Sequence, residues 1–180
     1  MGGYKNLLIY RLARTIFDFN FIFIERWIDK KGRTYDQMYQ AARSGKQNIA
    51  EGSKEISSSS ELLLNSVSRS SYTELIEDYE DFLRQRKLPV WKKEDPRVLR
   101  IRTFQEKTDK DTNLTDLASW TQLDLNIPEN FANMMICLCY KQGYLIDQFL
   151  RSKQEKFVKE GGFRENLFRK RREFQKRLIK

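Results

Sequence analysis

Apolar residues recur with a helical period over residues 3–28, the first stretch of the chain. Spacings of three, four and seven residues place one set on a single helix face, namely Leu7, Tyr10, Phe17, Phe21, Ile24 and Ile28. A second apolar side consists of Leu8, Leu12, Phe19, Ile22, Phe23 and Trp27. Two explanations are open for this second side: a subunit interface, or packing on both sides of the helix within one chain.

The pattern predicts a second helix that ends near Glu51. Lys30-Lys31-Gly32 ends the first helix, and either Thr34 or Asp36 supplies a side-chain oxygen that can cap the next one. Gly52 marks the stop, since glycine readily adopts the left-handed turn that ends many helices.

A third helix is predicted from Ser58 to about Arg86. Ser58 and Glu61 have the spacing of a capping box, in which the serine hydroxyl and the glutamate carboxylate each accept a hydrogen from the other residue's amide. Apolar residues follow at helical spacing, at Leu63, Val67, Leu75, Tyr79, Phe82 and Leu83.

The periodicity weakens over residues 87–127, which we interpret as a long loop with one or two short helices. Asp95-Pro96 suits the start of a short helix, because proline fits the first helical turn. Pro128 similarly suits the start of a fourth long helix, which runs to about Glu160 and is ended by Gly161-Gly162. Its apolar positions are Phe131, Met135, Leu138, Leu145 and Phe149.

The last segment, residues 163–180, is predicted to be a basic amphipathic helix. Its narrow apolar stripe consists of Phe163, Leu167, Phe174 and Leu178. Around the stripe lie Arg164, Arg169, Lys170, Arg171, Arg172, Lys176, Arg177 and Lys180. We therefore expect a helical body over residues 1–160, which includes the loop 87–127, and a basic helical suffix over residues 161–180.

Charge is concentrated at the C-terminus. The net charge is +9, and residues 151–180 hold 12 Lys and Arg against 4 Asp and Glu. The first 150 residues hold 22 basic and 21 acidic residues, so the predicted body is nearly neutral. A basic tail of this kind is typical of a surface that binds a polyanion.

The composition favours a globular, soluble protein of the cytoplasm. Apolar residues make up 39% of the chain, which is enough to build a core. No apolar run reaches the length of a membrane span, and no signal peptide is recognisable. Cys137 and Cys139 lie on different faces of a predicted helix, so we expect them to be reduced and at least partly buried.

No pattern of catalytic residues is recognisable. The chain has no His, and it lacks phosphate-binding glycine loops and nucleophile elbows. Acidic residues cluster in the third helix, at Glu74, Glu77, Asp78, Glu80 and Asp81. We interpret them as a solvated face, because a di-metal site would need Glu-x-x-His motifs. No enzyme activity, no cofactor and no metal is expected.

Small residues predict close packing between the second and third helices. They are Ala41, Ala42, Ser44 and Gly45 in the second helix, and Ser66, Ser68, Ser70 and Ser71 in the third. Asn48, Glu51 and Gly52 form a polar motif beside them, which we interpret as structural. It could bond loop backbone or another subunit.

Two motifs resemble a bacterial four-helix-bundle family, typified by proteins encoded in ribosomal-RNA intervening sequences. The first comprises Gln37, Ala41, Ala42, Ser44 and Asn48-Ile49-Ala50-Glu51-Gly52, and the second is Ser70-Ser71-Tyr72-Thr73-Glu74-Leu75. The resemblance covers about residues 4–86 and 128–160. The segment that begins with residues 161–165 resembles a suffix carried by one branch of that family.

That branch is similar in fold to the accessory variability protein of diversity-generating retroelements, a pentameric barrel with a basic nucleic-acid-binding surface. The resemblance implies an all-α protein, an antiparallel up-and-down four-helix bundle with a C-terminal basic amphipathic helix, and assembly into a homo-oligomer such as a pentamer. Two departures matter: the loop 87–127 is long for the family, and the body is nearly neutral. The basic suffix is therefore the candidate nucleic-acid interface.

Two hypotheses of different class account for these features. In the first, the basic suffix binds a nucleic acid, with RNA as the expected ligand and DNA as the alternative. Its sequence specificity is low, because cations that surround a phosphate backbone do not read bases. In the second, the apolar stripe of the suffix docks on the body or on a partner protein, and its charges only keep the outer face solvated. Binding at a membrane surface is a weaker third interpretation, since the stripe lacks Trp.

Overall fold

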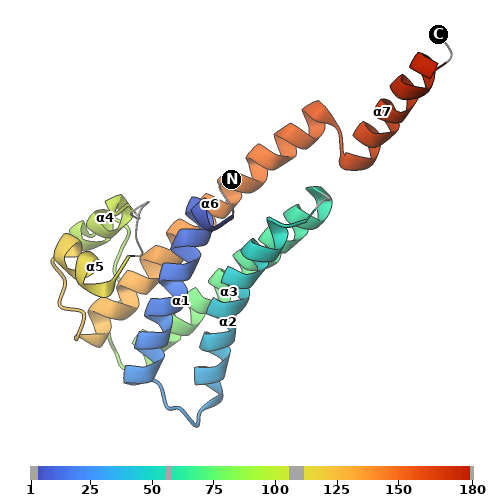
Figure 1. Cartoon of the computed structure of the whole chain (residues 1–180). Coiled ribbons are helices and arrows are strands. Elements are labelled where there is room, and N and C mark those ends of the chain that lie inside the picture. The colour runs from blue at the N-terminus through green and yellow to red at the C-terminus, as the bar shows by residue number, and fades with distance from the viewer. Residues whose placement is uncertain (1–3, 56–57, 106–111, 179–180) are drawn as a thin grey trace.

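All described elements of the chain are helices. The structure is a computed structural model that describes residues 4–55, 58–105 and 112–178 (Figure 1). The prediction of an all-α fold is therefore confirmed for these ranges. In chain order the elements are the 3₁₀ helix η1 (Tyr4–Asn6), α1 (Leu8–Trp27), α2 (Arg33–Gly52), α3 (Ser58–Gln85), α4 (Pro96–Thr103), α5 (Leu114–Thr121), α6 (Pro128–Glu160) and α7 (Phe163–Leu178).

Four long helices pack around one core. α1 contacts α2 and α6, and α3 also contacts α2 and α6, so each long helix contacts two other long helices. The short helices α4 and α5 contact each other, and α4 packs on α6, where Figure 1 shows the pair on one side of the body. None of the described helices combines the length and the apolar run needed to cross a membrane.

Several aromatic rings of the core surround Phe23 on α1. Tyr79 and Phe82 of α3 pack edge-on against it with ring centroids 4.8 Å away, and Phe131 of α6 lies at 5.7 Å. Edge-to-face aromatic pairs of this kind contribute about 0.5–1.5 kcal/mol each beyond the area they bury. α1, α3 and α6 are thus joined at a single residue.

The predicted inner face of α1 is partly wrong. Phe21 is 45% exposed, and Tyr10 and Phe17 are only half-buried. The residues buried in α1 are instead Ile9, Leu12, Ala13, Thr15, Ile16, Phe19, Asn20, Phe23 and Ile24. The difference arises because α1 has apolar groups on most of its surface, and contact with both α2 and α6 decides which of them are covered. Much of the predicted second side is thus packed within the chain.

α2 starts earlier than the predicted caps. Its N-cap is Gly32, in an extended conformation and without a side-chain hydrogen bond, so neither Thr34 nor Asp36 caps the helix. The tight turn that begins at Asp29 decides this start, because the Gly32 amide donates to the Asp29 carbonyl at 2.9 Å.

α2 and α3 approach closely through small residues, as predicted. A Cβ atom on Gly45 would lie 2.7 Å from the Tyr72 ring, so only glycine fits there. The buried Ser68 hydroxyl donates to the Gly45 carbonyl at 2.7 Å, and the Ser71 hydroxyl lies 3.2 Å from that of Ser44. Two of the predicted serines, Ser66 and Ser70, are exposed and face away from this contact.

The predicted apolar face of α3 is correct in its second half only. Leu75, Tyr79, Phe82 and Leu83 are buried, whereas Leu63 and Val67 are 66% and 44% exposed. In the first half of α3 small and polar residues take the positions that face α2. Leu63 and Val67 therefore lie on the exposed side of the helix. The Ser58 side chain of the predicted capping box lies outside the described residues, and the Glu61 carboxylate forms an ion pair with Lys153 of α6 at 2.8 Å.

The region 87–127 holds two short helices, as predicted. Asp95 caps α4 by accepting the Arg97 amide hydrogen at 2.8 Å, and Pro96 occupies the first turn. Asn113 caps α5 in the same way. The polar stretch 106–111 lies outside the described residues.

α6 has the predicted bounds. Pro128 opens the helix, and Gly161 ends it at a positive φ of 78°. Cys137 and Cys139 within it are both buried and unpaired, as expected.

Candidate functional site

The junction between α6 and α7 is built from specific local bonds. The Glu165 carboxylate accepts the Gly162 amide hydrogen at 2.9 Å, and the Asn166 side chain donates to the Gly161 carbonyl at 3.1 Å. A Cβ on Gly161 would lie 2.7 Å from the Glu165 carboxylate, and one on Gly162 would lie 2.9 Å from the Phe157 ring. The two glycines therefore permit a capped helix start that sets the direction of α7.

α7 projects from the end of α6, away from the other helices (Figure 1). Six of the predicted binding residues are exposed along it: Arg169, Lys170, Arg171, Arg172, Lys176 and Arg177. No ion pair within the described ranges involves any of the six. Arg169 donates to the Asn166 side chain at 2.5 Å, and the Arg172 guanidinium lies 5.9 Å from the centre of the Phe168 ring. Most of these cations are therefore presented to solvent.

The side chains of two predicted binding residues lie outside the part that the structure describes. Arg164 belongs to α7, but its side chain lies outside the described residues, as does the whole of Lys180. Seven of the eight predicted residues thus share one helix.

The apolar stripe of α7 is exposed. Phe163, Leu167 and Phe174 are 53%, 55% and 62% exposed, and the Leu178 side chain lies outside the described residues. Phe168, which does not belong to the predicted stripe, is 63% exposed. The stripe does not dock on the helices of its own chain, which removes one version of the scaffold hypothesis and leaves the version with a partner.

The polar motif at the end of α2 bonds within its own chain. The Asn48 amide donates to the Ser44 hydroxyl at 3.1 Å, and the Glu51 carboxylate accepts from Gln47 at 3.1 Å. The expected left-handed turn at Gly52 is wrong, because among the described glycines only Gly161 has a positive φ. Gly52 is instead the buried last residue of α2, where a Cβ would meet the Asn65 amide of α3 at 3.0 Å.

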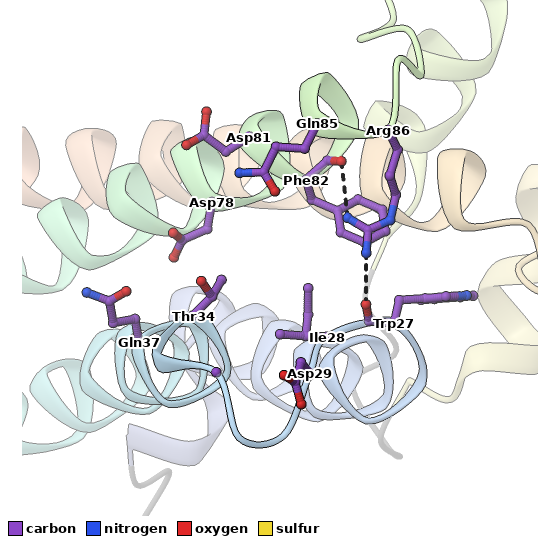
Figure 2. A pocket seen from close by; sticks show the side chains of 11 residues that line it. Trp27, Ile28, Asp29, Thr34, Gln37, Asp78, Asp81, Phe82, Gln85 and Arg86 are labelled. Carbon is purple, nitrogen blue, oxygen red and sulfur yellow. Dashed lines mark hydrogen bonds between the residues drawn. The ribbon is translucent and has the colours of Figure 1, made fainter.

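The acidic cluster of α3 borders a pocket of about 330 Å³ between α3 and the α1–α2 turn. Figure 2 shows Asp78 and Asp81 on one side of this pocket, opposite Thr34 and Gln37. Arg86 closes one end by donating to the Trp27 carbonyl at 3.2 Å and to the Phe82 carbonyl at 3.5 Å.

The predicted solvated face is confirmed for most of the acidic cluster. Glu74, Glu77 and Asp81 are exposed, whereas Asp78 and Glu80 are half-buried. Burial raises the pKa of the Asp78 carboxyl to about 6, and the nearby carboxylates of Asp81, Glu74 and Glu77 add to this effect. Within the described ranges no group of three or more acidic or cysteine side chains is arranged to hold a metal ion.

The thiols of the two cysteines have low reactivity. Burial raises the pKa of the Cys137 thiol to about 12 and that of the Cys139 thiol further still. Because the thiolate is the reactive form, neither cysteine is suited to act as a nucleophile near neutral pH.

A second concave region, a groove of about 940 Å³, lies between the segment 90–94, α4 and α6. Tyr140 and Tyr144 line its α6 side and are 60% and 62% exposed. The cations that line it are Lys92, Lys93, Arg102 and Lys141, and its two carboxylates are those of Glu80 and Glu94.

Sequence patterns did not reveal this groove, because its walls come from elements about 50 residues apart in the chain. One signal was present. Tyr140 and Tyr144 are four residues apart in a helix, which puts both rings on one face.

Comparison with family models, with curated proteins and with solved structures finds none that is similar to this chain.

Proposed function

We propose that this protein is a non-enzymatic, oligomeric nucleic-acid-binding protein that binds its ligand through α7, with RNA as the expected ligand and DNA as the alternative. The observation that carries the proposal is the set of six exposed cations on α7, none of them paired with a carboxylate of the described chain. Lys and Arg so presented neutralise phosphates and release condensed counterions, which provides affinity without sequence specificity.

The geometry of α7 supports this role. A helix that projects from the body can lie along a phosphate backbone with cations on more than one side, whereas a helix packed on the body would present one side only (Figure 1). Arg171 and Arg172 are adjacent in sequence and therefore point to different faces of the helix.

The family resemblance is part of the same proposal. The four long helices form a closed circuit of contacts, with α1 on α2, α2 on α3, α3 on α6 and α6 on α1. This circuit supports an antiparallel four-helix bundle of the intervening-sequence type. The homo-oligomer, such as a pentamer, is what the resemblance to that family implies. Two buried, unpaired cysteines support a cytoplasmic location, where thiols stay reduced.

The test is binding of the full-length protein to a fluorescently labelled structured RNA, measured by anisotropy at several salt concentrations. We expect the logarithm of the affinity to fall linearly with the logarithm of the salt concentration. The double variant Arg171→Gln/Arg172→Gln should bind more weakly, with a slope smaller by about 0.7–0.9 for each phosphate that the variant no longer neutralises.

The matched control is Lys31→Gln/Arg33→Gln, which removes two exposed cations near the α1–α2 turn. It should leave both the affinity and the salt slope unchanged. Equal weakening in the two double variants would show that net charge, and not α7, drives binding. Light scattering on the same samples gives the number of subunits. A monomeric protein that does not bind RNA would refute the proposal.

The exposed stripe of α7 favours a second candidate, a scaffold that binds a partner protein. Phe163, Leu167 and Phe174 offer apolar surface that the chain itself does not cover. In this case Leu167→Ser would abolish capture of the partner, while Arg171→Gln/Arg172→Gln would leave it intact. The RNA-binding proposal predicts that Arg171→Gln/Arg172→Gln weakens RNA binding and that Leu167→Ser leaves RNA binding intact.

A further inference from the structure

We propose that the groove lined by α4 and α6 binds bases of a single-stranded nucleic acid, with the neighbouring phosphates at Lys92, Lys93 and Arg102. This inference rests on the proposed function and adds what α7 lacks, because cations that contact phosphates do not hold the bases. It depends on the juxtaposition of two exposed tyrosine rings with exposed cations at one groove.

The aromatic side of the groove suits stacking. Tyr140 and Tyr144 lie one helical turn apart on α6, where Cβ atoms are about 5–6 Å from each other. Each ring is more than half exposed, so neither is used up by the core. Every base has a flat π face, and stacking on such rings tolerates any sequence.

The charge at the groove selects an anion. Four cations line it against the two carboxylates of Glu80 and Glu94. The contact between Lys93 and Glu94 is long, at 3.8 Å, and both side chains are largely exposed, so the pair leaves the lysine available. Lys141 donates to the Phe104 carbonyl and helps to hold α6 near the end of α4.

The same charge argues against α7 of a second copy as the occupant. Its stripe is apolar, but the surrounding Arg and Lys side chains would face the cations Lys92, Lys93 and Arg102. Like charges brought together across an interface oppose binding. A ligand that is flat, partly apolar and anionic fits better.

The wall and floor of the groove are held in place before any ligand arrives. Trp91 is buried, and its indole N–H donates to Glu129 at 2.9 Å while its backbone amide donates to Asn133 at 2.8 Å. The Arg97 guanidinium covers the ring at 3.7 Å. The volume of about 940 Å³ lies within the range of about 300–1,000 Å³ typical of ligand pockets, so the groove has room for bases.

The test compares a labelled ten-nucleotide single-stranded RNA with the same sequence as a duplex, by anisotropy with the full-length protein at one salt concentration. In Tyr140→Ala/Tyr144→Ala the affinity for the single strand should fall about tenfold or more, because the bases lose the tyrosine rings on which they stack. Affinity for the duplex, whose bases are already stacked, should be unchanged. Tyr140→Phe/Tyr144→Phe keeps the rings and should bind within about twofold of wild type.

The control is Phe21→Ala, which removes an exposed ring of α1 outside the groove and should change neither affinity. Unchanged single-strand affinity in the Tyr-to-Ala variant, or equal weakening for both RNAs, would overturn the assignment while the role of α7 stands. If neither RNA binds the wild type, the proposed function itself fails and this inference with it. A fall in oligomer mass in the Tyr-to-Ala variant, at unchanged RNA affinity, would identify the groove as an interface between copies and also refute it.

Discussion

The hydroxyl of Tyr79 on α3 donates a 2.8 Å hydrogen bond to the side-chain oxygen of Asn20 on α1, and both residues are fully buried. Asn20 in turn donates its amide hydrogen to the Met38 carbonyl of α2 at 3.1 Å. These two hydrogen bonds, which share Asn20, thus join three helices inside an apolar core. Because an unpaired polar group is costly there, these bonds favour a single rotation of α1 relative to its neighbours.

Replacing Tyr79 with Phe should destabilise the fold by about 1–3 kcal/mol, because the buried Asn20 oxygen loses its donor. Urea denaturation at one protein concentration measures the change, as a lower midpoint at constant slope.

Tyr72 provides the matched control on the same helix. It is equally buried, but within the described ranges its hydroxyl forms no hydrogen bond. Tyr72→Phe should therefore be neutral or stabilising. Equal destabilisation by the two Phe variants would contradict this account of the core.

Gly45→Ala should destabilise the protein by about 1–3 kcal/mol, as overpacking of a close contact does. The added Cβ would meet the Tyr72 ring at 2.7 Å, so α2 and α3 would have to separate. Gly143→Ala in α6 is the control, because its Cβ would have nothing within 4 Å. That variant should gain up to about 1 kcal/mol from helix propensity. Thermal denaturation of both variants should give midpoints on opposite sides of the wild-type value.

Asp78 should make stability fall as the pH rises from about 4 to about 6. The pKa of this carboxyl is raised in the folded state, so in that window the unfolded chain ionises first and gains free energy relative to the fold. Asp78→Asn should flatten the profile and add about 1 kcal/mol near neutral pH, a figure reduced because solvent screens a half-exposed group.

The measurement for Asp78 is the free energy of unfolding at several pH values. Glu173→Gln, which removes an exposed carboxylate of α7, serves as the control and should keep the wild-type slope. A variant at position 78 with the wild-type profile would show that neither burial nor the neighbouring carboxylates raise the pKa of Asp78 in solution.

Glu165→Ala should loosen the start of α7. The variant leaves the Gly162 amide without its acceptor, and loss of such a cap costs about 1 kcal/mol. Hydrogen exchange in the first turn of α7 should accelerate about fivefold while the body is unchanged. Glu173→Ala, later in the same helix, should not reproduce the effect; if it does, the helix start is not held by this bond.

Local signals in the sequence were sufficient to predict most helix boundaries. Asp95-Pro96, Pro128 and Gly161 each mark a boundary where the structure has one. These residues act through their own backbone geometry or through the nearest amides, so no tertiary information is needed. The prediction for Gly52 failed, because this glycine allows close contact with α3 and does not form a turn.

The buried faces could be predicted only in part. Leu63 and Val67 have the right spacing for a core but lie outside, because the first half of α3 faces α2 with small and polar residues. Tyr79 carried a periodic signal, but its buried polar partner Asn20 did not.

The sequence by itself determined that this chain is helical, where most of its helices begin and end, and that its last helix carries most of the net charge. Only the tertiary structure decided which side of α1 is buried and that α7 stands clear of the body. It also brought Tyr140 and Tyr144 beside Lys92 and Lys93. The physical reason is that capping, helix propensity and charge act over a few residues, whereas burial depends on which distant elements pack together.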